Sequence, residues 1–257
     1  MSATESNAWS ENAVDYVQAI ADTKLALSHR YADQGFLGPN LADNIALFSL
    51  TQDEYGHVRQ LFLKLQEQGR DDAWLHRDRD ADEFHNAASV DEPAPDWLRF
   101  EVQVGLTDRA VLLMLDAIDH EDFAGLTDKI SEEEYSHVDF HDGWLEHLAT
   151  TQPNEFQAAL DETLPDVLAF IGPAAYDEET DPLYTAGFTD RTVRELREAF
   201  LELCEDITDS TNVTIPDVAP IDLANWDSER RRTDDGMIDR ETIDSLQARN
   251  NQEFAMR

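Results

Sequence analysis

The sequence predicts an all-α protein: a four-helix bundle with a long crossover connection and additional helices toward the C-terminus. Apolar residues recur at helical spacing through four segments of about 25 residues each, and strand-type alternation is almost absent. The connections between these segments run short, long, short. That order is typical of a bundle built from two helical hairpins.

The first helical hairpin is predicted near the N-terminus. Its first helix runs from Glu11 to Asp33, with Ser10 as the N-cap and Gly35 beyond its end. Its second helix runs from Asn40 to Gln68 and stops at Gly69, a residue that suits the position after a helix C-cap.

The crossover and the second hairpin follow. Residues 70–95 are charged, contain two prolines near their end and show no clear period, so we expect them to form the crossover. The third helix is predicted from Asp96 to Asp119. The fourth runs from Phe123 to Ala149 and ends before Pro153.

The chain beyond the bundle carries further helical patterns. We expect three helices there: Asn154 to Ile171, Asp190 to Ile207 and Asp239 to Phe254. The stretch from Thr211 to Met237 has little apolar periodicity. We therefore expect a flexible N-terminus over residues 1–10, one helical domain over residues 11–210, and an extension over residues 211–257 that packs on the bundle.

The charge balance is strongly acidic. Asp and Glu number 56 against 19 Lys and Arg, which gives a formal net charge of −37. Such an excess argues against nucleic acid and anionic membranes as partners. The long apolar stripes argue against disorder. A hydrated acidic surface of this kind is typical of proteins from salt-loving organisms.

The sequence also predicts the cellular compartment. The single cysteine, Cys204, excludes an intramolecular disulfide framework and suits a reducing compartment. Residues 1–10 show no signal-peptide pattern, and no apolar run approaches the length of about 18 residues that suggests a spanning helix. We expect a cytoplasmic protein.

Two Glu-x-x-His motifs stand out, Glu54 with His57 and Glu134 with His137. Residues three apart share one face of a helix, so each carboxylate and its imidazole can reach a common point. Both motifs interrupt apolar stripes. Burying these ionisable groups would be costly unless they pair with one another or hold a cation, so a metal shared between the two helices is the leading hypothesis.

A pair of metals in such a bundle also needs one carboxylate from each of the other two helices. Asp22 is the best candidate in the first helix, and Asp108 in the third, with Glu101 as the alternative to Asp108. The predicted ligands are Asp22, Glu54, His57, Asp108, Glu134 and His137. Four carboxylates and two imidazoles suit two iron ions, or manganese, better than structural zinc.

Other roles for these residues stay open. Asp22 lies on a half-polar stripe and could pair with Lys24 or face solvent. Asp108 could pair with the adjacent Arg109. His141 follows His137 by one turn, and we expect it to support the cluster or pack in the core rather than bind metal.

Several blocks of the sequence resemble a known family: Ile20-Ala21-Asp22-Thr23, Leu41 to Arg59, Arg77-Asp78-Arg79, Asp108, Glu133 to His137, and Gly143 to Leu148. These blocks are similar to the A and C subunits of the bacterial phenylacetyl-CoA epoxidase, a ring 1,2-monooxygenase. The length and the blocks are closer to the C subunit.

The resemblance implies a ferritin-like di-iron bundle that forms part of a multicomponent oxygenase in phenylacetate catabolism. In this family the A subunit binds the metal and the CoA-thioester substrate, whereas typical C subunits are scaffolds that have lost ligands. This sequence departs from such scaffolds because it keeps both motifs. The implied partners are a sister subunit or a second copy of the chain, and an NAD(P)H-dependent reductase that supplies electrons for O2-dependent chemistry.

Three rival hypotheses remain. The chain could be a non-catalytic C-type subunit that supports a catalytic partner. It could be an iron or peroxide protein similar to ferritin or rubrerythrin. It could also be a helical interaction module with an internal Glu–His network and no metal.

Overall fold

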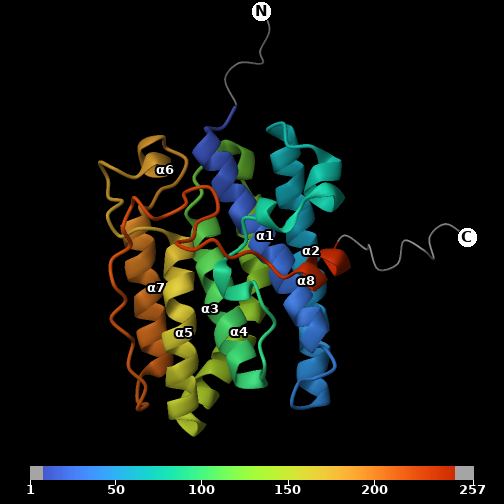
Figure 1. Cartoon of the computed structure of the whole chain (residues 1–257), viewed down its shortest axis with the longest axis vertical. Coiled ribbons are helices and arrows are strands. Elements are labelled where there is room, and N and C mark those ends of the chain that lie inside the picture. Colours follow the sequence, from blue (N-terminus) through green and yellow to red (C-terminus); the bar gives the residue numbers. More distant parts are fainter. Residues whose placement is uncertain (1–7, 247–257) are drawn as a thin grey trace, which may run out of the picture.

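The computed structural model describes residues 8–246, and these form an all-α, ferritin-like bundle without strands. The bundle helices are α1 (Glu11–Gln34), α2 (Leu41–Glu67), α3 (Trp97–Asp116) and α4 (Leu126–Thr151). α1 packs along α2, and α3 packs along α4 (Figure 1). The predicted fold class is confirmed.

Side-chain caps set where the first three bundle helices begin. The Ser10 side chain accepts a hydrogen bond from the backbone of α1, Asn40 caps α2 and Asp96 caps α3. At the end of α2, Gly69 takes φ +97°, and the Arg70 amide donates to Leu65 O at 3.0 Å. This geometry is a Schellman motif, and it explains why the helix stops at the predicted glycine.

The second hairpin differs from its prediction at the turn. α3 ends at Asp116, and residues Glu121–Phe123 form a separate 3₁₀ turn rather than the start of the fourth helix. α4 begins after Gly125, which takes a left-handed backbone conformation with φ +74°. Helical periodicity alone could not separate this turn from the helix, because Phe123 is buried as a helical residue would be.

The crossover between α2 and α3 is not regular, but it contains three short helical turns: Trp74–Asp78, Ala81–Glu83 and Ala88–Val90. It is attached to α1 by hydrogen bonds. The Ala87 amide donates to Thr23 Oγ1 at 3.0 Å, and the His85 amide donates to Asp22 Oδ2 at 3.1 Å. α1 is therefore covered on the side that faces away from the other bundle helices.

The remaining helices are α5 (Pro153–Ile171), α6 (Pro182–Thr185), α7 (Val193–Thr208) and α8 (Arg240–Leu246). α5 and α7 lie beside α3 and α4 (Figure 1). The segment before α8 crosses the bundle, and Arg232 binds Asp91 of the crossover at 2.8 Å. The division into domains stays a prediction, and residues 1–7 and the part of the predicted last helix beyond residue 246 lie outside the described residues.

Among the described residues, no helix has both the length and the apolar character that crossing a membrane requires.

Candidate functional site

The two Glu-x-x-His motifs face each other inside the bundle. Glu54 and His57 lie on α2, Glu134 and His137 lie on α4, and none is more than 1% exposed. Asp108 joins them from α3 and is also buried. The structure thus brings together five of the six residues that the sequence predicted as metal ligands.

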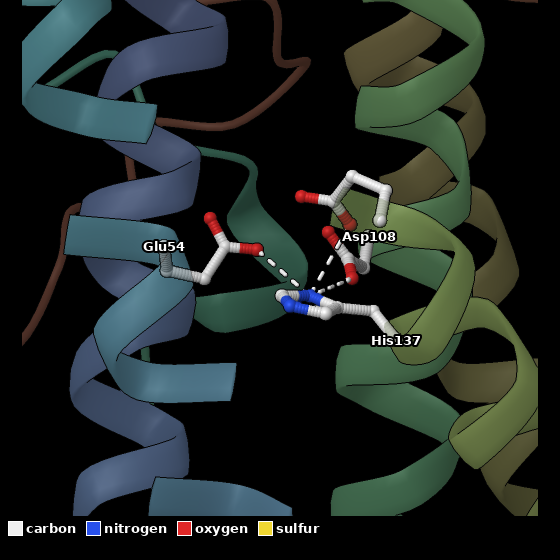
Figure 2. Close-up of side chains that lie close together, drawn as sticks. Glu54, Asp108 and His137 are labelled. Carbon is white, nitrogen blue, oxygen red and sulfur yellow. Dashed lines mark ion pairs between the residues drawn. The ribbon is translucent and has the colours of Figure 1, made fainter. Parts of the chain in front are cut away.

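His137 lies at the centre of three carboxylates. Its Nδ1 is 3.5 Å from Glu54 Oε1, 3.5 Å from Asp108 Oδ2 and 3.2 Å from Glu134 Oε2. Figure 2 shows Glu54 and Asp108 approaching the imidazole from different helices. His57 Nδ1 lies 3.0 Å from Glu134 Oε1 on the same cluster.

Four of these residues have the arrangement of a metal site. Glu54, Asp108, Glu134 and His137 each offer one ligand atom, and these atoms lie within 4.8 Å of one another. A buried group of carboxylates and an imidazole is the donor set that iron or manganese takes in helical bundles. The ligand atoms of these four residues are therefore of a type and spacing that could hold a metal ion.

A sixth side chain belongs to this cluster, and it is Lys24. Its Nζ donates to Glu134 Oε1 at 2.5 Å, to both oxygens of Glu54 at 3.0 and 3.1 Å, and to Asp108 Oδ1 at 3.4 Å. The side chain is fully buried. α1 therefore contributes an ammonium to the cluster where the sequence predicted a carboxylate.

Asp22 does not reach the cluster. Its Oδ2 accepts a hydrogen bond from Arg79 Nη1 at 2.6 Å and another from the His85 amide at 3.1 Å. Two residues along a helix differ by about 200° around its axis, so Asp22 faces the crossover when Lys24 faces the bundle interior. Neither pairing with Lys24 nor solvent exposure, the two open alternatives for Asp22, describes its position.

The sequence reasoning missed Lys24 as a site residue, although a signal was present. Val17, Ile20, Leu27 and Tyr31 share its helical face, and all four are buried. A lysine in the middle of such a stripe needs a buried anionic partner.

A second layer of polar residues surrounds the cluster. His141 Nδ1 lies 2.8 Å from Glu101 Oε2, and its Nε2 lies 3.0 Å from the Tyr31 hydroxyl. That hydroxyl donates to Asp108 Oδ2 at 3.4 Å. Glu101, the alternative ligand on α3, is thus the partner of His141, and His141 supports the cluster as expected.

The predicted alternative pairing of Asp108 with Arg109 is wrong. Arg109 forms its ion pair with Asp142 of α4 instead.

The cluster is held together by charge. Burial alone would raise the pKa of Glu134, but Lys24 and the imidazoles of His137 and His57 hold it well below its usual range. Burial alone would lower the pKa of His137, but hydrogen bonds to Asp108, Glu134 and Glu54 raise it to about 12. The same three carboxylates raise the pKa of Lys24 against the effect of burial. Two cationic side chains therefore offset most of the carboxylate charge.

The donor atoms and the buried lysine limit how many metal ions these residues can hold. The donor atoms suit one ion, provided that the Lys24 ammonium leaves the cluster. A pair of ions in this class of bundle takes a carboxylate from all four helices, and α1 supplies none here. The residues as arranged do not fit a two-metal centre.

The fold and the site define a ferritin-like bundle whose interior holds a carboxylate–histidine cluster closed by a lysine. The family of phenylacetic acid catabolic proteins matches residues 1–251, and the chain belongs to this family. The predicted family is thereby confirmed, without distinction between A and C subunits. The family belongs to a multisubunit catabolic complex. No curated protein matches the chain significantly.

Proposed function

We propose that the chain is a structural, non-catalytic subunit of a multicomponent phenylacetyl-CoA-type ring epoxidase. Family membership supports the pathway. The non-catalytic role is carried by one observation: Lys24 Nζ lies 2.5–3.1 Å from the glutamates of both Glu-x-x-His motifs. The oxygens that would bind iron are already hydrogen-bonded to an ammonium.

Dioxygen activation in such complexes requires a di-iron centre, which would reside in a catalytic sister subunit. That subunit would bind the CoA thioester and receive electrons from the NAD(P)H-dependent reductase. The present chain would supply a rigid bundle on which the sister subunit packs. Its internal cluster would connect α1, α2, α3 and α4 through one cation, which is a stabilising rather than a reactive arrangement.

The test is a reconstitution with an A-type catalytic subunit and the reductase. We expect the chain with the reductase alone to give no phenylacetyl-CoA-dependent consumption of NAD(P)H and no oxygenated product. The A-type subunit should gain activity and solubility when the chain is added. Product formation by the chain and reductase without the A-type subunit would overturn the structural role.

A second candidate is an iron-binding catalytic subunit, and the placement of four ligand atoms within 4.8 Å of one another favours it. It requires Lys24 to withdraw when metal enters. Its signature would be about one iron per chain after expression with iron, lost in the Glu54→Ala/Glu134→Ala variant. Equal and negligible iron in both proteins would leave the structural role as the function of the chain.

A further inference from the structure

We propose that the Lys24 ammonium is a permanent internal cation that takes the place of metal in this bundle. We further propose that Lys24 alone keeps the chain from forming a two-metal centre. This inference deepens the proposed function by naming what replaces the metal. Its test uses the isolated chain, so it can fail separately from the role in the complex.

The number of donors on Lys24 matches the number of carboxylates. An ammonium has three N–H donors, and the cluster presents one carboxylate from each of the other bundle helices: Glu54 on α2, Asp108 on α3 and Glu134 on α4. Nζ lies within 3.4 Å of an oxygen of each. One cation thus joins all four helices, which is the geometric task that metal ions perform in related bundles.

A metal ion and the ammonium exclude each other. A divalent ion held by Glu54 and Glu134 would lie within a few ångströms of Nζ, where like charges repel strongly in a buried site. Lys24 is also fully buried. Moving its ammonium away from the carboxylates would leave an unpaired charge inside the bundle.

No other residue of α1 can supply the missing carboxylate. Asp22, the nearest acid, is held on the opposite side by Arg79 and by the His85 amide. Among the charged side chains of α1, Lys24 is the one whose terminal group reaches the carboxylates of the cluster. A glutamate there would complete a set of four carboxylates and two imidazoles.

The experiment compares iron retention by four proteins: the wild-type chain, Lys24→Glu, Lys24→Met and the control Lys129→Glu. Lys129 is 59% exposed on α4, so the control makes the same charge change outside the bundle. Each protein is incubated with excess Fe(II) without oxygen and then desalted. We expect negligible iron in the wild type and in Lys129→Glu, and about two irons per chain in Lys24→Glu.

Thermal stability gives the second readout. Lys24→Met removes one of the two cations that offset the three buried carboxylates, so we expect a lower Tm than wild type in EDTA and a recovery when Fe(II) or Mn(II) is added. The Tm of the wild type should not respond to either metal.

The proposal is overturned if the wild type retains about one iron or more per chain or gains Tm with Fe(II). It is also overturned if Lys24→Met melts in EDTA at the wild-type temperature, or if folded Lys24→Glu retains no more iron than wild type. Should Lys24→Glu fail to fold, the wild-type and Lys24→Met measurements still decide the matter.

Discussion

Asp22 and Arg79 form a buried ion pair beside the central cluster but separate from it. Both side chains are 0% exposed, and the guanidinium carbon of Arg79 also lies 3.9 Å from the centre of the Phe84 ring. The pair connects α1 to the crossover. Because Asp22 and Lys24 are two residues apart, this contact also holds the rotation of α1 that directs Lys24 into the bundle.

Replacing Asp22 by asparagine should therefore destabilise the fold without changing its metal chemistry. Removing one partner of a buried pair leaves an uncompensated charge and costs about 3–5 kcal/mol. We expect Asp22→Asn to lower the free energy of unfolding by about this amount in urea titrations. Asp33→Asn, at a half-exposed carboxylate on the same helix, is the control. An unfolding free energy of Asp22→Asn equal to that of the wild type would contradict the stabilising role of the pair.

At the scale of elements, α5 carries an acid in an unfavourable environment. Burial, together with the nearby carboxylates of Asp234 and Asp91, raises the pKa of Asp166 to about 6 against the opposing effect of Arg232. These groups come from α5, the crossover and the C-terminal segment. The contact of α5 with both segments therefore concentrates negative charge.

The sign of the pH dependence follows from this pKa. The folded state holds the Asp166 proton more tightly than the unfolded state, whose pKa is near 3.8. Stability linked to Asp166 should therefore fall as the pH rises from 3.8 to about 6, and the cost persists above that range.

Asp166→Asn should remove this cost. After allowance for solvent screening, we expect a gain of about 1 kcal/mol at pH 7.5, or about 2–4 °C in Tm. The gain should vanish near pH 4. Asp161→Asn, at an exposed position on the same helix, should show no comparable effect. A gain for Asp166→Asn that is equal at both pH values would refute the assignment to its charge.

At the scale of the whole molecule, more than a third of the basic residues lie in the interior of the described chain. The chain has 19 Lys and Arg, and the buried ones are Lys24, Arg30, Arg79, Arg109, Arg197, Arg231 and Arg232. The buried cations bind carboxylates and backbone carbonyls, as Arg231 does at Phe170 O at 2.7 Å. The ratio of acidic to basic residues is consequently even higher on the surface than in the whole sequence.

Salt should therefore stabilise the folded chain. Raising KCl from about 0.1 M to about 1 M shortens the Debye length from about 10 Å to about 3 Å, which screens repulsion among surface carboxylates. We expect Tm to rise with KCl by more than it rises with a neutral osmolyte of equal osmolality. A Tm that does not change with KCl would contradict the expectation of a salt-adapted protein.

The pattern of residues along the chain is enough to predict the fold class and most of the site. α2 and α4 each have a buried and an exposed face, so their apolar stripes were enough to place Glu54, His57, Glu134 and His137 inward. Caps and glycines such as Gly69 marked helix ends, because the residue type acts there through local backbone geometry. The turn before α4 was the exception, since Phe123 is buried in a non-helical conformation.

Which charged residue of α1 enters the cluster depends on packing between segments that are distant in the sequence. Almost every side chain from Tyr16 to Tyr31 is buried, because α1 is covered by the other helices on one side and by the crossover on the other. A helix buried all round has no polar face to reveal its rotation. The choice between Asp22 and Lys24 depended on Arg79, which lies more than fifty residues away in sequence and holds Asp22 outside the cluster.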